Sequence, residues 1–144
     1  RNDFVKGLHV LKAAMNLLKR PIELHMIGDW PEWDTGIHHV IHHGLIRDRQ
    51  KLMATLDECD VLLLPSLSEG MPTVALEAMS RGLNIIGADV GAMNTLRVKL
   101  FRAGDAQQLA CAINRGHSQL GTFNFPAEYT WGNVAQLTSN CLFD

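Results

Sequence analysis

Residues 62–84, LLLPSLSEGMPTVALEAMSRGLN, hold the pattern that decides the fold of this chain. The stretch opens within an apolar run, 61–64, of one Val and three Leu, which is typical of a strand buried on both faces of a parallel sheet. The polar residues 66–72 contain Gly and Pro, so they predict a loop. Pro72 then stands at the entrance of a predicted helix over 73–81. The stretch therefore predicts a strand, a loop and a helix in succession.

The junction between this loop and this helix is a favourable place for an anion. In an open α/β sheet, ligands bind beyond the carboxyl ends of the strands. A helix N-terminus at that edge offers free N–H groups and the positive end of the helix dipole. Two acids, Glu69 and Glu77, flank the junction. We therefore expect a phosphate-bearing ligand at residues 68–73, with the carboxylates left to bind hydroxyl groups.

Helix and strand patterns alternate along the rest of the chain. Apolar residues at three- and four-residue steps predict a helix over 6–19, and Asp48 is a predicted N-cap for another. The remaining predicted strands cover 22–27, 37–43, 84–88 and 98–101, and the remaining predicted helices cover 105–115 and 134–142. This alternation predicts an α/β fold, a Rossmann-like doubly wound parallel sheet with right-handed crossovers.

Composition limits the classes of protein to which the chain can belong. The 144 residues fit one domain over 1–144, and the net charge of −2 argues against a general nucleic-acid or anionic-membrane surface. Three cysteines without a C-x-x-C pair favour neither a disulfide framework nor a zinc site. The apolar runs are too short to span a bilayer. We expect a cytoplasmic domain.

The residues Glu69-Gly70-Met71-Pro72, with Glu77-Ala78-Met79 after them, resemble the C-terminal donor-binding domain of group 1 (family 4) retaining glycosyltransferases of the GT-B type. The family pattern is an E-G-x-P turn with a second Glu eight residues after the first. Arg1 with Lys6-Gly7, and the helix start at Gly104-Asp105, are similar to further family elements. Taken in order, these matches cover nearly the whole chain, and their order makes the resemblance specific.

The resemblance implies a role for each charged residue of the pattern. Glu77 is expected to accept hydrogen bonds from the two ribose hydroxyls of a nucleotide sugar, and Glu69 to lie near the hydroxyls of the donor sugar. Arg1 and Lys6 are expected to neutralise the diphosphate as the leaving group gains charge. Glu69, Lys6 and Arg1 are therefore the catalytic residues that the resemblance implies.

The resemblance also implies a binding surface made largely of backbone. The turn of Gly70, Met71, Pro72 and Thr73 is expected to cradle the sugar and the diphosphate, since Gly70 lets the main chain approach closely. The base is expected to rest against the segments after the second and third strands of the family fold, at Gly28 and at Ile46. No metal and no cofactor are implied, because cationic side chains and N–H groups can stabilise the charge of the leaving diphosphate.

The implied reaction moves a sugar from a nucleoside diphosphate sugar to a carbohydrate or lipid-linked acceptor in polysaccharide or glycolipid biosynthesis. The acceptor would bind an N-terminal domain that this chain lacks, so the isolated domain is expected to be inactive. Nucleic acid is not an expected partner. The resemblance allows peripheral association of the full-length protein with the inner face of the cell membrane.

Two other functions stay open at this point. A GT-B nucleotide-sugar epimerase shares the architecture, although the E-G-x-P turn argues against it. A non-catalytic nucleotide-sugar-binding module is the other, because Thr95 stands near the place where the family usually carries an acid. The His pairs at 38–39 and 42–43 fall on both faces of a predicted strand with no nearby Cys, so we predict no metal site there.

Overall fold

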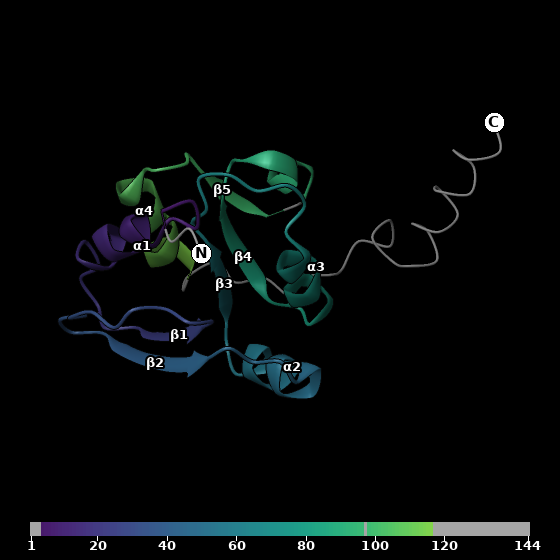
Figure 1. Cartoon of the computed structure of the whole chain (residues 1–144). Coiled ribbons are helices and arrows are strands. Elements are labelled where there is room, and N and C mark those ends of the chain that lie inside the picture. The colour runs from purple at the N-terminus through teal and green to yellow at the C-terminus, as the bar shows by residue number, and fades with distance from the viewer. Residues whose placement is uncertain (1–3, 97, 117–144) are drawn as a thin grey trace.

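The structure of the chain is a computed structural model that describes residues 4–96 and 98–116 (Figure 1). Its elements are α1 (Leu8–Met15), β1 (Glu23–Ile27), β2 (His39–Gly44), α2 (Arg49–Asp57), β3 (Val61–Leu64), α3 (Thr73–Ser80), β4 (Asn84–Ala88), the 3-10 helix η1 (Gly91–Thr95), β5 (Lys99–Phe101) and α4 (Ala106–Gly116). Every predicted strand and helix within these residues is confirmed, whereas η1 was not predicted. The predicted helix over 134–142 lies outside the described residues.

Local chemistry explains where the helices begin. The Asp48 carboxylate accepts hydrogen bonds from the N–H groups of Gln50 (2.8 Å) and Lys51 (3.4 Å), as expected for an N-cap. Asp105 caps α4 by accepting from the N–H of Gln108 at 2.9 Å. The helix α1 is shorter than the predicted 6–19 at both ends: it begins at Leu8, because Gly7 adopts the left-handed conformation (φ 72°) directly before it, and it ends at Met15.

All strand pairs are parallel, but the strands divide into two sheets. One sheet has the order β1-β2, with Glu23 opposite His39, and the other has the order β3-β4-β5, with Val61 opposite Asn84. In Figure 1 the β1–β2 pair lies across the line of β3 and β4. The predicted parallel α/β architecture is confirmed, and within the described residues it is interrupted between β1 and β3.

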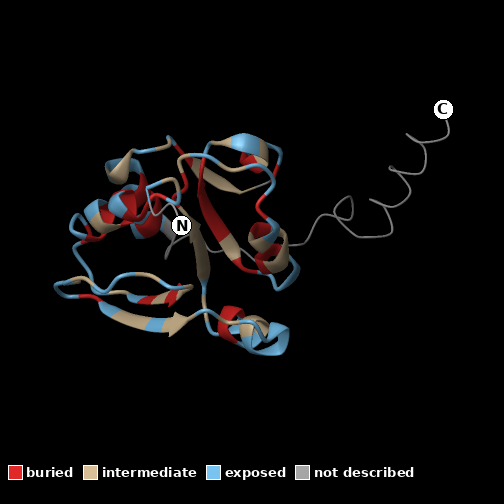
Figure 2. Cartoon of the chain, viewed as in Figure 1, coloured by how far each residue is buried: buried red, intermediate tan, exposed pale blue. Residues whose placement is uncertain are grey.

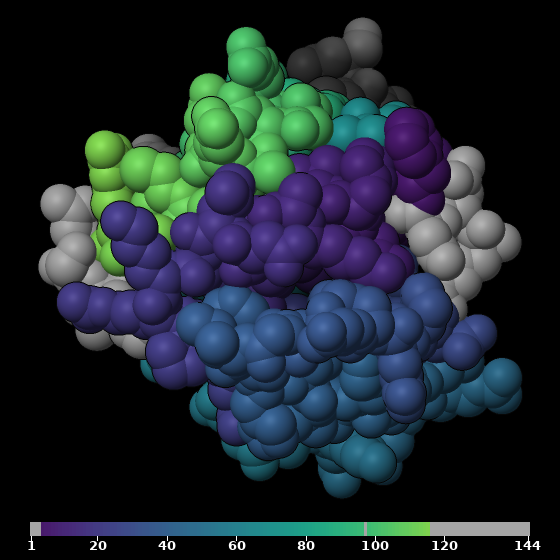
Figure 3. Space-filling view, turned by 90° about the vertical axis from the view of Figure 1, so that its left-hand side faces the viewer, coloured from purple at the N-terminus to yellow at the C-terminus, as the bar shows by residue number. Residues whose placement is uncertain are grey.

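Helices cover both faces of the β3–β4–β5 sheet. One cluster of buried residues joins α1 and α4 to Ile86 and Ala88 of β4, and a second cluster joins α2 and α3 to Ile85. Successive side chains of β4 therefore point to opposite faces and meet different helices. Figure 3 shows α1 beside α4 on the first face, with the β2 segment below them. This two-sided cover is the doubly wound arrangement predicted from the sequence.

Burial differs between neighbouring strands (Figure 2). Residues 85–88 of β4 are all buried, whereas all four residues of β3 are only half-buried. The prediction that 61–64 are buried on both faces is therefore wrong for the described residues. The physical reason is that, among residues 4–96 and 98–116, β3 pairs with a strand along one edge only, while β4 pairs along both.

Candidate functional site

The loop at residues 65–72 joins the carboxyl end of β3 to the N-terminus of α3. Pro72 is the N-cap residue of α3, and it provides no side-chain hydrogen bond to the helix. The first turn of α3 contains no acid. The free N–H groups of this turn and the positive end of the dipole are therefore not compensated by a capping side chain. This is the arrangement that favours an anionic ligand.

A second helix N-terminus meets the same loop. The N–H of Leu67 donates to the carbonyl oxygen of Val5 at 2.7 Å, just before α1 begins. A Cβ on Gly7 would stand 1.9 Å from the carbonyl oxygen of Pro65, so no other residue fits there without a shift. The first turn of α1 also lacks an acid and a side-chain cap. Two uncapped helix N-termini thus border one loop.

The turn after β4 holds the loop from its other side. The N–H of Ala92 donates to the carbonyl oxygen of Gly70 at 3.0 Å. A Cβ on Gly91 would lie 1.9 Å from the carbonyl oxygen of Glu69, and Gly91 has a φ of 55°. Glycine at position 91 is therefore needed both for the backbone conformation and for the contact with Glu69-Gly70. The loop is fixed between Gly7 and Gly91.

One carboxylate oxygen of this loop receives two hydrogen bonds. The Lys6 ammonium lies 2.5 Å from Oε1 of Glu69, and the hydroxyl of Ser66 donates to the same oxygen at 2.8 Å. Ser66 is buried, with 3% of its surface exposed. Both of these bonds go to Oε1, so Oε2 of Glu69 can accept from a further donor. Sequence reasoning missed Ser66, since a Ser in a polar turn carries no signal of its own.

Most of the other predicted residues of the turn and of α3 lie on the outer side, whereas Pro72 is buried. Thr73 and Glu77 are one helical turn apart on α3, on the face opposite the buried Ala75, Ala78 and Met79. Gly70 and Met71 are exposed, Met71 to 48%. The Glu77 carboxylate is half-buried and accessible from the same side as Thr73. A ligand can therefore reach the exposed residues of this turn and the outer face of α3.

The ends of β1 and β2 also meet. The N–H of Gly28 donates to the carbonyl oxygen of Gly44 at 2.7 Å, which brings the two predicted base-binding segments together. Ile46 follows two residues later and is half-buried. The indole N–H of Trp30 donates to the carbonyl oxygen of Ile27 at 2.7 Å, so this ring packs on the domain itself. Arg1, the remaining predicted residue, lies outside the described residues.

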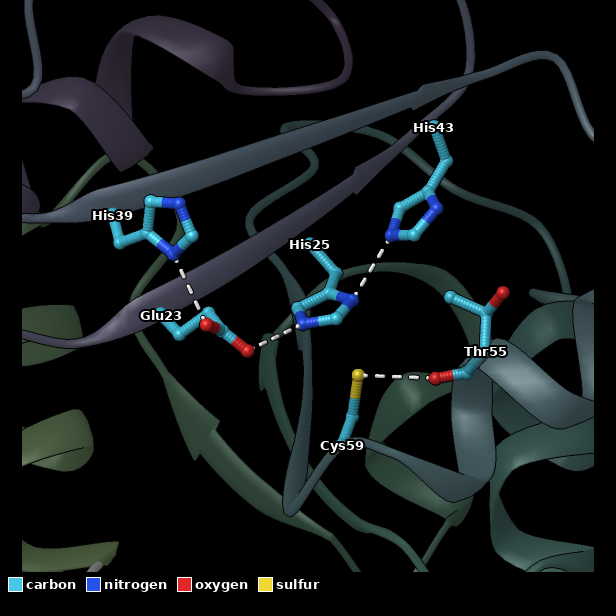
Figure 4. Close-up of polar contacts among 6 residues, drawn as sticks. All are labelled: Glu23, His25, His39, His43, Thr55 and Cys59. Atoms are coloured by element: carbon cyan, nitrogen blue, oxygen red, sulfur yellow. Dashed lines mark hydrogen bonds and ion pairs between the residues drawn. The ribbon is translucent and has the colours of Figure 1, made fainter.

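A second polar cluster lies on β1 and β2 (Figure 4). Glu23 accepts hydrogen bonds from His25 (2.9 Å) and His39 (3.0 Å), and the other ring nitrogen of His25 lies 2.9 Å from Nε2 of His43. The hydrogen bond from His25 lowers the pKa of the Glu23 carboxyl, and that from His39 adds to the effect. Burial lowers the pKa of His43, and the charge of His25 lowers it further.

This cluster is not arranged as a metal site. Among residues 4–96 and 98–116, no group of three or more His, Cys, Asp or Glu side chains could hold a metal ion. One of the two facing nitrogens of His25 and His43 must donate to the other, so neither of these two atoms is available to a metal ion in this arrangement. Cys59 lies nearby and donates to the carbonyl oxygen of Thr55 at 3.3 Å, and burial raises the pKa of its thiol.

The fold and the loop define a class of protein: a parallel α/β domain with an uncapped helix N-terminus at the carboxyl end of a strand. A family model described as "Glycosyl transferases group 1" matches residues 2–118. The chain belongs to this family. Within the described residues, no helix has the length and apolar character needed to cross a membrane.

Individual proteins show the same relationship. The chain is 34% identical over 122 residues to the teichuronic acid biosynthesis glycosyltransferase TuaC of Bacillus subtilis, an alignment that covers 80% of this chain and 31% of TuaC. A sucrose-phosphate synthase from Thermosynechococcus elongatus superposes with a TM-score of 0.76 at 23% identity, over 99% of this chain and 43% of that one. HepE of Anabaena in complex with UDP gives a TM-score of 0.68 at 22% identity, over 100% of this chain and 43% of HepE. These two structures show the same fold, and the chain spans about a third of the length of TuaC.

Proposed function

We propose that this chain is the donor-binding domain of a glycosyltransferase that transfers a sugar, with retention at the anomeric carbon, from a nucleoside diphosphate sugar. The observation that carries the proposal is the convergence of Lys6 and Glu69, 63 residues apart, beside the uncapped N-terminus of α3. Membership of the glycosyltransferase family supports it. Crystal structures of HepE hold UDP or UDP-glucose, which supports a donor of this chemical class.

The diphosphate would bind at the junction of the 65–72 loop with α3. The N–H groups at Gly70, Met71 and Thr73, next to Pro72, supply donors, and Lys6 supplies a positive charge. In the described arrangement Lys6 is paired with Glu69. Donor binding would therefore exchange this ion pair for a contact between Lys6 and a phosphate oxygen, and Arg1 would add a second cation.

The sugar and the nucleoside would lie on either side of the diphosphate. Glu69, already held through one oxygen by Ser66, would present its other oxygen to a sugar hydroxyl. Glu77 would accept hydrogen bonds from the ribose hydroxyls on the outer face of α3. The base would rest against Gly28 and Ile46. The electrostatic stabilisation of the leaving diphosphate would come from Lys6, Arg1 and helix dipoles, with no metal or other cofactor.

The acceptor would come from polysaccharide or lipid-linked glycan biosynthesis. TuaC, to which the chain is similar, carries teichuronic acid biosynthesis in its name, and this supports a carbohydrate acceptor. The acceptor would bind a further domain of the full-length protein, which would act in the cytoplasm or at the inner face of the cell membrane. The domain alone would bind the donor weakly and transfer nothing.

Titration of UDP, GDP and ADP into the protein, followed by calorimetry or NMR, tests the proposal. We expect one nucleotide to bind and to shift the amide signals of Gly70, Met71 and Thr73. Glu77→Ala should weaken nucleotide binding by about tenfold, because a hydrogen bond to a charged group contributes about 1.5 kcal/mol or more. The same change should leave pyrophosphate binding unaltered.

Glu58→Ala is the matched control, because Glu58 is an exposed acid at the end of α2, away from the 65–72 loop. It should alter neither affinity. If none of the three nucleotides binds to a folded sample, the proposal is wrong. If nucleotide sugar binds to the full-length protein but no acceptor is ever glycosylated, a non-catalytic binding module is the better description.

A further inference from the structure

The Lys6 ammonium and the Glu69 carboxylate neutralise one another at the place proposed for the donor diphosphate. Nζ of Lys6 lies 2.5 Å from Oε1 of Glu69. The side chain of Lys6 is 51% exposed, whereas that of Glu69 is only 16% exposed. An anionic ligand can therefore reach the cation, while the carboxylate beside it lies within the loop.

Contacts on two sides fix the position of Glu69. The hydroxyl of the buried Ser66 donates to Oε1 of its carboxylate at 2.8 Å. The main chain of Glu69 is packed against Gly91, where a Cβ would lie 1.9 Å from the Glu69 carbonyl oxygen. A carboxylate held in this way has little freedom to turn aside when a ligand arrives. Its negative charge therefore stays next to Lys6.

A pyrophosphate group meets two opposite effects at this position. The N-terminus of α3 has neither an acid in its first turn nor a side-chain cap, so it attracts an anion together with Lys6. Glu69 repels the same anion and competes with it for Lys6. An ammonium has three donors, but its single charge is then shared between two anions. Glu69 therefore lowers the affinity of the site for a pyrophosphate group that carries no sugar.

A sugar attached to the diphosphate offsets this loss of affinity. Lys6 and Ser66 both donate to Oε1 of Glu69, so Oε2 can accept from a sugar hydroxyl. A hydrogen bond to an ionised carboxylate is stronger than one between two neutral groups. A nucleotide sugar therefore regains at Glu69 what its diphosphate loses at Lys6. A nucleoside diphosphate has no sugar hydroxyl to offer to Glu69, so it does not.

We propose that Glu69 makes the site discriminate between the nucleotide sugar and the nucleoside diphosphate that remains after transfer, because it competes with the diphosphate for Lys6. This inference rests on the proposed function and adds a role in product release. Once the sugar has left, Glu69 has lost its hydroxyl partner and forms the ion pair with Lys6 again. The affinity for the remaining nucleoside diphosphate then falls, and the site is freed for the next donor.

Binding measurements on the full-length protein test this proposal with the isosteric change Glu69→Gln. The new amide can still accept from Ser66, but it carries no charge. The variant should bind pyrophosphate, and whichever of UDP, GDP and ADP the protein binds, about threefold to tenfold more tightly. The reason is that a partly exposed ion pair no longer has to be broken and a nearby negative charge is gone. Unchanged or weaker binding of the nucleoside diphosphate, measured by calorimetry, would overturn the proposal.

The corresponding nucleotide sugar (UDP-glucose, GDP-mannose or ADP-glucose) should respond differently to Glu69→Gln. Its affinity should stay the same or fall, because the variant has lost the charged acceptor for a sugar hydroxyl. The preference of the protein for nucleotide sugar over nucleoside diphosphate should therefore decrease by about tenfold. An equal gain in affinity for both ligands would show that Glu69 does not discriminate between them.

The change Lys6→Gln separates competition for the cation from simple repulsion. In a protein that already carries Lys6→Gln, the further change Glu69→Gln should raise the affinity for the nucleoside diphosphate by less than it does in the wild-type protein. The reason is that no ion pair is left to be broken. An equal gain in both backgrounds would mean that Glu69 acts without Lys6, and it would contradict the proposal.

Two further variants control these measurements. Glu58→Gln removes the same charge from an exposed acid at the end of α2 and should change none of the affinities. Glu69→Ala also removes the carboxylate, so it should tighten the binding of the nucleoside diphosphate even where Glu69→Gln does not fold. If the wild-type protein binds no nucleotide, the proposed function is wrong and this inference is wrong with it. If it binds one and neither variant at Glu69 binds it more tightly, only this inference is wrong.

Discussion

The strands β3 and β4 are neighbours, yet their burial is the reverse of what their compositions suggest. β4 contains Asn84 and Gly87 and is buried from residue 85 to residue 88, whereas β3 contains only Val and Leu and is half-buried throughout. Within the part of the chain that the structure describes, β4 has a paired strand on each side and β3 has one on a single side. Burial in this fold therefore depends on pairing along both edges, and hydrophobicity alone does not secure it.

The largest expected effect is a difference in the free energy of unfolding between a truncated side chain in β4 and one in β3. Ile86→Ala should lower the free energy of unfolding by about 3 to 4 kcal/mol, because Ile86 is fully buried in β4. Leu63→Ala in β3 should cost only about 1 to 2 kcal/mol, because that side chain is only half-buried. Urea denaturation of both variants measures the difference. Equal losses would show that the edge of β3 is not open in solution.

A smaller effect concerns the contact between the loop after β3 and the turn after β4. Gly91→Ala should cost about 2 to 3 kcal/mol, because the new methyl group meets the carbonyl oxygen of Glu69 and the backbone has a positive φ. Gly82→Ala has the same backbone problem, with a φ of 79°, but its methyl group would meet no atom within 4 Å. We expect it to cost only about 1 kcal/mol.

The pair of glycine variants also bears on binding. Only Gly91→Ala should weaken the binding of nucleotide, because only Gly91 holds the 65–72 loop. Thermal unfolding and nucleotide titration measure the two effects. A loss of affinity in both variants would mean that the backbone strain, and not the contact with Glu69, is responsible.

The next effect tests how the loop after β3 holds its carboxylate. Ser66→Ala removes the buried hydroxyl that donates to Glu69, and we expect a loss of about 1 to 2 kcal/mol in the free energy of unfolding. Ser68→Ala, in the same loop but exposed, should change it little. Chemical denaturation of both variants checks this. An unchanged stability for Ser66→Ala would indicate that water replaces the hydroxyl.

The smallest effect concerns the polar cluster on β1 and β2. The pKa of His43 is lowered in the folded chain, so the unfolded chain binds a proton more readily, and stability should fall as the pH drops below about 6.5. The pKa of Glu23 is also lowered, so its contribution is present above about pH 4.5 and is lost only in stronger acid. Melting temperatures at about pH 7.5 and about pH 5.5 therefore report mainly on His43.

Variants of the histidines complete this test. His43→Gln should reduce the decrease in melting temperature, whereas His42→Gln, on the opposite face of β2, should leave it unchanged. The loss of stability at low pH should appear first as faster hydrogen exchange of the amides of β1 and β2. An equal effect of both variants would place the pH dependence elsewhere in the chain.

Much of the fold follows from the sequence because its local signals agree with one another. Asp48 is a cap in the structure as in the sequence, and the strand over 84–88 has the predicted bounds. The sequence predicts that Lys6 and Glu69 bind the same donor molecule, and the structure brings their side chains into contact. The roles of these residues in binding and catalysis stay predictions.

Other features depend on contacts that a local pattern does not encode. Ser66 is a buried donor only because Glu69 folds back over it, and the Glu23–His25–His43 chain of hydrogen bonds depends on the pairing of two separate strands. The half-burial of 61–64 does not follow from the local pattern either, since this run has the composition of a fully buried strand. Pairing between strands that are distant in sequence decides these features.

The two uncapped helix N-termini have a consequence for the behaviour of the protein in salt. They place two positive dipole ends, together with Lys6, at one edge of a molecule whose net charge is −2. Such a local field attracts an anion from a distance, and ions screen it beyond about 10 Å at 0.1 M salt. The rate at which a charged ligand finds this edge should therefore decrease as the ionic strength rises.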